Sequence, residues 1–301
     1  MKRADIIVRS GAANPSGAAL PMTPEHAAYR LLRPAGPPAP VVLDSPHSGT
    51  HYPDDFGSVL PLEQLRAAED RFVDELFADA PRHGAVLLCA HVARIYLDCN
   101  RAENDLDAEL IEGAAPGASG KASLGKSLVW RLTDAGAAIY ARRLTAGEVR
   151  RRIDAVHRPY HDALRGLLDE AAAAHGAVWH VNCHSMPAVG GAMSADRGRE
   201  RADVVLGDRD GTSCEAAFTG LVEEFFAERG YSVRVNDPFK GVELVRAYSD
   251  PARRRHSLQI ELNRRLYMDE RSRERAAGFD ALRRDLDALA AAVVAYAKDR
   301  A

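Results

Sequence analysis

Two histidines in this chain stand where they could bind a hydrolytic metal. His184 follows the apolar residues 178–183, and His47 lies in the segment SPHSG, shortly after another apolar run. A hydrolytic zinc site takes two neutral imidazoles and one carboxylate from the protein and leaves one position for water, whose pKa falls to about 7. Alternatively, each histidine could be a core residue whose ring nitrogens are satisfied by the backbone.

The acidic ligand is expected from the segment AEDRFVDEL, in which Glu69, Asp70 and Asp74 are available, and Asp70 is our choice. Apolar residues at helical spacing predict that this segment belongs to one helix over residues 62–83. The same acids could instead form an ordinary solvated face of that helix.

Glu261 lies among apolar neighbours in SLQIELNR, on an expected buried strand. An isolated ionised carboxylate there would be costly, so Glu261 should face the cleft or a cation. In the cleft it could act as general base, taking a proton from water and passing it to a leaving nitrogen. The alternative role is an ion pair with an arginine such as Arg264.

Several polar residues could hold a carboxylate of the substrate. In DCNR, Arg101 offers a planar fork of donors beside the amide of Asn100, a pairing suited to a carboxylate. The turns RPYH and NDPFKG add further candidate contacts, namely Arg158, His161, Asn236 and Lys240. A second carboxylate would need a second grip, for which the candidates are Arg158, Lys240, Arg254 and His256.

Three other chemistries are poorly supported. The run DCNRAENDLDAE is not a calcium loop, because Glu103 stands where the EF-hand pattern requires glycine. Ser45 and Ser48 lie near His47 without a GxSxG elbow, which argues against a serine hydrolase. Cys183 is adjacent to His184 on the expected strand, and adjacent strand residues point to opposite faces, which argues against a thiol nucleophile.

The elements that must position these residues alternate between strands and helices. We expect strands near residues 41–43, 85–89, 95–97, 178–183, 204–206, 232–236 and 258–262, with helical patterns between them and a C-terminal amphipathic helix from Ser272. This order predicts an α/β sheet with helices on both faces. At least four strands end in polar clusters, and ligands of such sheets bind beyond the carboxyl ends of the strands. The clusters should therefore share one site.

Composition limits the remaining possibilities. Residues 1–39 are rich in Gly, Ala and Pro and are expected to form an arm, with a single domain over residues 40–301. A formal net charge of −3 disfavours a nucleic-acid partner, and no apolar run is long enough for a membrane span or a signal peptide. Four scattered cysteines without a CxxC pair favour a reducing, cytoplasmic location.

The motifs SPHSG, AEDRFVDELF, YLDCNR, RPYH, NCHSMP, NDPFKG and QIELNRRLYM resemble, in order and approximate spacing, those of the N-formylglutamate amidohydrolase family. The resemblance covers roughly residues 40–290. The arrangement of motifs is more distantly similar to that of zinc carboxypeptidases and aspartoacylase. This similarity implies a mixed, mostly parallel sheet flanked by helices. It implies His47, Asp70 and His184 as ligands of zinc, Asn100 and Arg101 as the carboxylate grip, and Glu261 as general base.

The implied activity is hydrolysis of N-formyl-L-glutamate to formate and L-glutamate, in histidine degradation. Asn182 and Val242 depart from the family pattern, where Asp and Gly are expected, and this bears on substrate identity more than on hydrolysis. Hydrolysis of another N-acyl amino acid or a small peptide is the main alternative, and a catalytically silent binder of acidic amino-acid derivatives is a third. The ligand set would also suit manganese, iron or cobalt.

Overall fold

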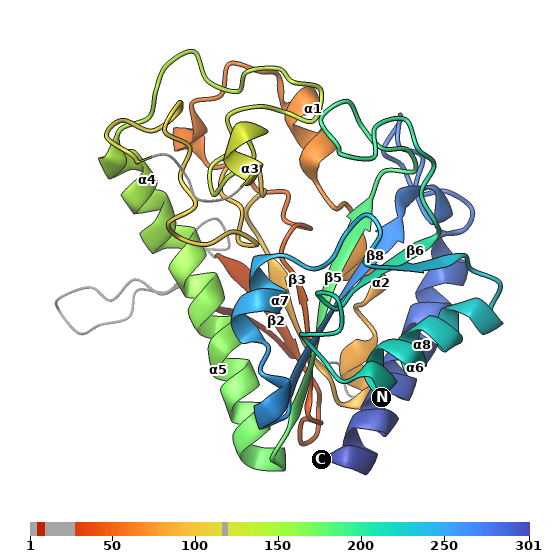
Figure 1. The fold of residues 1–301 in the computed structure, drawn as a ribbon. Helices are drawn as coiled ribbons and strands as arrows, with labels where there is room; N and C mark the ends of the chain where they lie inside the picture. The colour runs from red at the N-terminus through yellow and green to blue at the C-terminus, as the bar shows by residue number, and fades with distance from the viewer. Residues whose placement is uncertain (1–4, 10–27, 116–119) are drawn as a thin grey trace, which may run out of the picture.

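A mixed sheet of eight strands forms the centre of the computed structural model, which describes residues 5–9, 28–115 and 120–301 (Figure 1). The strand order is β1-β2-β4-β3-β5-β8-β6-β7. The central strands β4, β3, β5 and β8 are parallel, whereas β2 pairs antiparallel with β4 and β6 pairs antiparallel with β8. The strands are β1 (Asp5–Arg9), β2 (Tyr29–Arg33), β3 (Val41–Ser45), β4 (Val86–Ala90), β5 (Val178–Met186), β6 (Val204–Gly207), β7 (Val233–Val235) and β8 (Arg255–Asn263).

Helices cover both faces of the sheet, as predicted (Figure 1). The long helix α5 packs on one face, and α2, α6 and α8 pack on the other. Alternation along β5 sends Trp179, Val181 and Cys183 into the core beneath α6 and α8. The helices are α1 (Leu62–Leu65), α2 (Val73–Leu76), α3 (Gly120–Ser123), α4 (Ala146–Arg152), α5 (Arg158–His175), α6 (Ala216–Glu228), α7 (Glu243–Tyr248) and α8 (Phe279–Arg300).

Six of the seven strands predicted by residue range coincide with strands of the sheet. The prediction of a strand near residues 95–97 is wrong. Ile95 and Leu97 are both buried, but their segment is a turn. Its backbone bonds go to neighbouring loops, because the Tyr96 N–H donates to Ala93 O and the Asp98 N–H donates to Leu128 O. The apolar run therefore signals burial under loops.

The prediction of a single helix over residues 62–83 is also wrong. The segment breaks into α1, the 3₁₀ turn η3 (Arg66–Ala68), α2 and the 3₁₀ turn η4 (Ala80–His83). Between η3 and α2 the Asp70 N–H donates to His47 O at 2.9 Å, and Phe72 adopts a φ of 68°. This bond turns the chain out of the helix, and Asp70 therefore sits in a tight turn next to the loop of His47.

Part of the Gly/Ala/Pro-rich stretch belongs to the sheet. β2 pairs with β4, and β1 pairs with β2, so these two segments of the expected arm are strands of the sheet. The remaining residues of that stretch before Ala28 lie outside the described ranges, and the boundary between arm and domain stays a prediction. The C-terminal helix begins at Phe279, later than Ser272. Among the described helices, none has the length and apolar character needed to cross a bilayer.

Candidate metal centre

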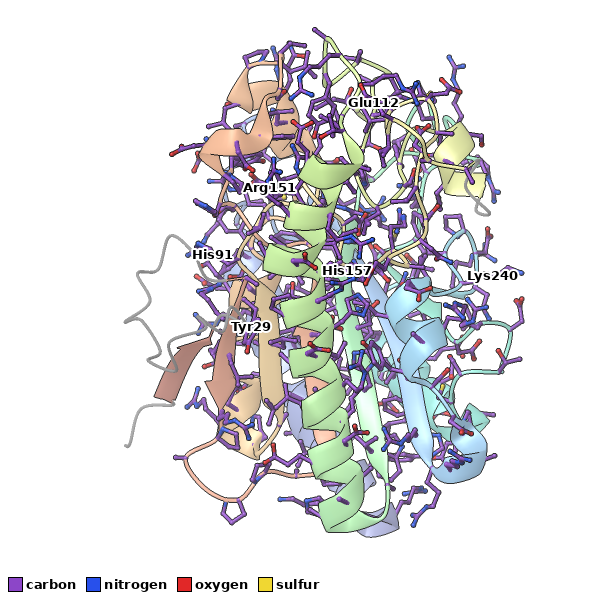
Figure 2. The ribbon with its side chains drawn as sticks, turned by 90° about the vertical axis from the view of Figure 1, so that its left-hand side faces the viewer. Tyr29, His91, Glu112, Arg151, His157 and Lys240 are labelled. Atoms are coloured by element: carbon purple, nitrogen blue, oxygen red, sulfur yellow. The ribbon has the colours of Figure 1, made fainter. Side chains whose placement is uncertain are left out.

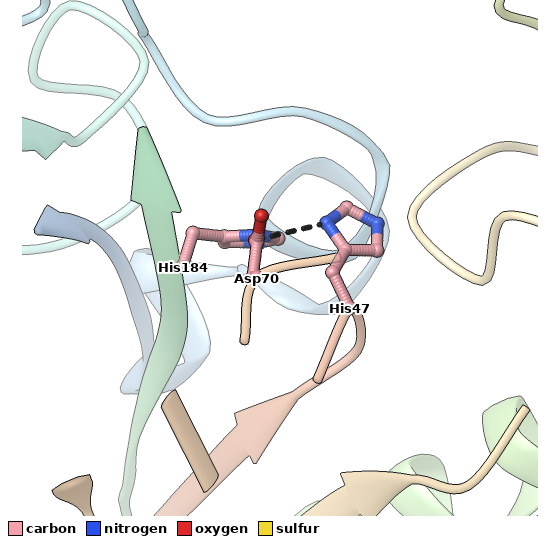
Figure 3. Close-up of side chains that lie close together, drawn as sticks. All are labelled: His47, Asp70 and His184. Carbon is pink, nitrogen blue, oxygen red and sulfur yellow. Dashed lines mark hydrogen bonds and ion pairs between the residues drawn. The ribbon is translucent and has the colours of Figure 1, made fainter. Parts of the chain in front are cut away.

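Three ligand atoms converge beyond the carboxyl ends of the central strands (Figure 3). His184 comes from β5, His47 from the loop after β3, and Asp70 from the turn before α2. Asp70 Oδ2 lies 3.4 Å from His47 Nδ1 and 3.1 Å from His184 Nδ1. Two ligands on a tetrahedral ion, each at its usual distance, are ~3.3 Å apart. The spacing therefore fits a small divalent metal.

The loop that carries His47 is held against the neighbouring loop after β4. The His51 N–H donates to His91 O, and the Ala93 N–H donates to His51 O. A Cβ on Gly49 would lie only 2.3 Å from the carbonyl oxygen of Val92, so this close approach requires glycine. The glycine of SPHSG thus lets the loop bring His47 to the site.

The hydrogen bonds of His47 leave one ring nitrogen available to a metal. His47 Nε2 lies 2.6 Å from Asp98 Oδ1, and a carboxylate can only accept, so Nε2 carries the proton. The other nitrogen, Nδ1, is buried and has no hydrogen-bond partner among the described residues. A buried nitrogen with an unused lone pair, facing a carboxylate and a second imidazole, is the expected geometry of a metal ligand.

His184 is oriented by a chain of bonds that starts at Asp44. Asp44 is fully buried and accepts from His180 Nε2, Asn182 Nδ2 and the Tyr160 hydroxyl. Because Asn182 donates to Asp44, its oxygen faces His184 Nε2 at 2.8 Å and accepts its proton, a shorter contact than the 3.2 Å between Nε2 and the Asn100 amide nitrogen. His184 Nδ1 is thereby left as an acceptor. Asn182 thus transmits the orientation set by the buried carboxylate of Asp44.

Asp70 is a fully buried carboxylate that the neighbouring imidazoles and Arg94 keep ionised. Burial raises its pKa, but contacts with His184 and His47 and the charge of Arg94 hold it well below its ordinary value. Arg264 Nη2 lies 3.0 Å from Oδ1, and Arg94 Nη1 lies 3.7 Å from the same oxygen. The arginines therefore occupy one carboxylate oxygen, and the other faces the histidines.

The other two candidate acids are used elsewhere. The Glu69 carboxylate accepts from the Tyr52 hydroxyl at 2.6 Å, and burial raises its pKa. Asp74 forms an ion pair with Arg30. Of the three acids, Asp70 is the one that the structure brings to the two histidines.

His184 is well suited to bind a metal as neutral imidazole. Burial and the proximity of His47 lower its pKa to about 4. A metal ligand must offer an unprotonated nitrogen, which this pKa ensures at neutral pH.

Glu261 stands beside His184 in the sheet, where the two residues are register partners of β8 and β5. It lines the cavity and accepts from Gln259 Nε2 at 2.9 Å. Burial and the charge of Asp70 raise its pKa well above the ordinary value, and a divalent cation nearby would lower it again. The alternative ion pair with Arg264 is not formed, because that guanidinium binds Asp70.

The three ligands open into a cavity of about 440 Å³ with a cationic wall. The cations of this wall are Arg94, Arg101, Lys121 and Lys126. Burial lowers the pKa of Lys121, and the charges of Arg101, Lys126 and Arg94, which line the same cavity, lower it further. Excess positive charge beside a metal site favours an anionic ligand.

Asn100 and Arg101 both line the cavity, but they differ in what remains available to a ligand. Asn100 Oδ1 accepts from the Leu244 N–H, and its amide nitrogen lies 3.2 Å from His184 Nε2. Arg101 donates through Nε to Lys126 O and through Nη1 to Asn100 O, whereas Nη2 lies 3.6 Å from Asp98, its one ion-pair partner among the described residues. Arg101 is thus positioned by two bonds and keeps one nitrogen for a carboxylate.

The structure does not bring four predicted substrate contacts to the cavity. Arg158 pairs with Glu103 and is 41% exposed. Lys240 pairs with Asp210 and is 57% exposed, at the outer edge of the molecule in Figure 2. The other two are His161, which bonds Cys99 O and Tyr248, and Asn236, which bonds Asp208. Two further candidates for a second grip, Arg254 and His256, lie at the start of β8, away from the site.

Sequence reasoning missed several cavity residues. Arg94 and Arg264 enclose Asp70 from loops that are distant in sequence, and Lys121 lies in a segment without a recognisable pattern. The motif NDPFKG does reach the cavity, but through Pro238 and Phe239. Ion pairing with Asp98, four residues after Arg94, is the one local signal that could have been found.

Comparisons with known proteins agree with this site. A family model described as N-formylglutamate amidohydrolase matches residues 39–268. An N-formylglutamate deformylase of Pseudomonas putida is 29% identical over 77% of this chain and 82% of its own length. The crystal structure of N-formylglutamate amidohydrolase from Ralstonia eutropha JMP134 superposes with a TM-score of 0.85 at 45% identity, covering 91% of this chain and 99% of that chain.

A second solved structure shares the fold at greater distance. The gene product Atu2144 from Agrobacterium tumefaciens is 18% identical, with a TM-score of 0.66 over 91% of this chain and 96% of that chain. The family model alone spans most of the chain and includes all three converging ligands. The chain belongs to the N-formylglutamate amidohydrolase family.

Proposed function

We propose that this protein hydrolyses N-formyl-L-glutamate to formate and L-glutamate with a divalent metal held by His47, Asp70 and His184. The observation that carries the proposal is the convergence of two imidazole nitrogens and one carboxylate oxygen in a cavity with a cationic wall. The names of the relatives support the substrate. We place the reaction in histidine degradation and, because all four cysteines are free and buried, in the cytoplasm.

Zinc is the metal that fits this donor set best. Hydrolytic zinc sites combine nitrogen and carboxylate ligands in this way, although other divalent transition metals accept them too. When bound, the ion would supply Lewis-acid polarisation of the formyl carbonyl and of the attacking water. The fit rests on the unpaired Nδ1 of His47 and on the ring orientation of His184.

The remaining steps belong to side chains of the cavity. Glu261 accepts a proton from the attacking water and delivers it to the nitrogen of the departing glutamate. Arg101 binds one substrate carboxylate through Nη2, and Lys121 binds the second. The amide bond breaks as the new carbon–oxygen bond forms, and the products are formate and L-glutamate.

Metal removal tests the first part of the proposal. Purified protein is expected to release formate from N-formyl-L-glutamate, to lose this activity after chelation and to regain it with zinc. Formate measured by a coupled dehydrogenase assay, together with metal analysis of the same samples, provides the readout. Full activity in samples shown to be free of metal would contradict the assignment of the three ligands.

Substitution of Asn182 tests the orientation of His184. Asn182→Leu removes the acceptor of the His184 Nε2 proton, and we expect zinc affinity to fall about 10- to 100-fold. Competition with a chromophoric chelator measures the affinity, and circular dichroism verifies that the variant is folded. Unchanged zinc affinity in the folded variant would show that Asn182 does not orient the ligand.

Glu261→Gln tests the proton transfer. The amide keeps the shape of the side chain but cannot accept the proton, so kcat should fall by a factor of about 10²–10⁴ while zinc content stays the same. Glu270→Gln is the matched control, because Glu270 lines the same cavity but accepts from the Ala188 N–H. Substantial turnover by the Glu261 variant would exclude it as general base.

Lys121→Met tests recognition of the second carboxylate. We expect KM for N-formyl-L-glutamate to rise about 10- to 100-fold, in line with the loss of a charge-assisted hydrogen bond. KM for N-formyl-L-glutamine should change little, because that substrate lacks the second charge. Lys240→Met, outside the cavity, is the control. An equal effect on both substrates would favour another N-acyl amino acid as the natural substrate.

A further inference from the structure

The loop that carries the carboxylate grip is held from behind by two histidines. We define the grip loop as residues 98–101, which bears the side chains of Asp98, Asn100 and Arg101. His161 Nε2 lies 2.8 Å from Cys99 O, and His157 Nε2 lies 2.9 Å from Arg101 O. The intervening carbonyl, Asn100 O, accepts from the Arg101 side chain. Three successive carbonyls of the grip loop therefore each receive a side-chain donor.

Both histidines act as donors in these contacts. A carbonyl oxygen can only accept, so Nε2 of each ring carries a proton. His161 Nδ1 is left as an acceptor by this tautomer, and the Tyr248 hydroxyl lies 2.8 Å from it and 3.2 Å from His161 O. Burial lowers the pKa of both rings, that of His161 to about 4, so they are neutral at physiological pH.

The helix is built to present the two rings together. The π-helical turn η5 (Ile153–His157) joins α4 to α5, and His157 therefore lies within one continuous helix (Figure 2). Pro159 lacks an N–H and would crowd the carbonyl four residues earlier in a regular α-helix, and a π turn relieves that conflict. His157 and His161 then stack with ring centroids 4.0 Å apart. Their four-residue spacing matches two carbonyls that are two residues apart in the loop.

The grip loop connects these histidines to the chemistry of the site. Asp98 accepts from His47, Arg101 lines the cavity, and Asn100 lies against His184. Neither His157 nor His161 is among the residues that line the cavity. Their effect on a substrate must therefore pass through the grip loop.

We propose that His157 and His161 are positioning residues that hold the grip loop so that Arg101 meets a substrate carboxylate. This inference rests on the proposed function, in which Arg101 binds that carboxylate. It assigns the motif RPYH a role in substrate affinity without substrate contact. The loss of either donor leaves a buried carbonyl unpaired and frees the loop to shift.

The test compares side chains that do or do not reach the carbonyl. A Gln amide nitrogen reaches about as far as His Nε2, whereas Asn is shorter and Leu has no donor. We expect His157→Leu, His161→Leu and the corresponding Asn variants to raise KM for N-formyl-L-glutamate at least 10-fold, with a smaller change in kcat. The Gln variants should return KM to within about threefold of the unaltered protein.

A matched control lies on the same helix. His175, at the end of α5, also places Nε2 near a backbone carbonyl, that of Pro38, at 3.0 Å and far from the cavity. His175→Leu should lower thermal stability without changing KM. Variants of His157 and His161 that lose stability but keep KM would reduce the pair to ordinary core residues. If the Leu variants do not fold, equal KM values for the Asn and Gln variants overturn the proposal.

Failure of the proposed function remains distinguishable from failure of this inference. Formate release by the unaltered protein tests the function alone. If none is seen, calorimetric binding of L-glutamate to the zinc-loaded protein replaces KM. The same order of affinities is expected, with the Gln variants close to the unaltered protein and the Leu and Asn variants weaker. Equal affinities across the series would overturn the proposal that His157 and His161 hold the grip loop.

Discussion

The site depends on keeping the carboxylate of Asp70 ionised in the interior. A buried charge is tolerated only when charged or hydrogen-bonding partners surround it. Those partners come from segments far apart in sequence: Arg264 follows β8, Arg94 follows β4, His47 follows β3 and His184 lies on β5. One carboxylate therefore links the ends of four neighbouring central strands, and the same requirement explains why the chain leaves the helical path before α2.

A second buried carboxylate organises the layer beneath. Asp44 accepts hydrogen bonds from three donors on the face of the sheet that α5 covers. One of these donors, Asn182, is also hydrogen-bonded to His184. Because alternate residues of β5 share a face, His180, Asn182 and His184 form one polar row while their neighbours pack in the opposite core. The candidate metal ligands are thus supported by paired polar groups, which fix ring orientation before any ligand arrives.

The segments between strands supply the cations of the cavity wall. The strands β5 and β8 present His184 and Glu261 on a rigid edge, whereas the cations of the cavity wall come from the segments between β4 and α4. This division suits hydrolysis of an anionic amide, because the reacting centre needs fixed geometry and the charged substrate needs an electropositive entrance. The grip loop, held by α5, joins the two parts.

The sequence by itself determined the order of the central strands along the chain, the α/β class, the family and the residue types available for the site. Periodicity and polar clusters at strand ends carry that information, because they reflect burial and the local backbone. Local patterns do not specify which distant charges meet. Ile95 and Leu97 looked like a strand because they are buried, and residues 62–83 looked like one helix because their apolar spacing is helical.

Only the tertiary structure decided that Asp70 sits in a turn beside His47, that Lys121 joins the cavity wall, and that His161 faces a backbone carbonyl. Arg158 and Lys240, equally plausible from their charge, find surface partners instead. The physical reason is that electrostatic and hydrogen-bond pairing acts through space. The partners of a buried charge are therefore set by how the strands and loops assemble, and the spacing of residues along the chain does not record them.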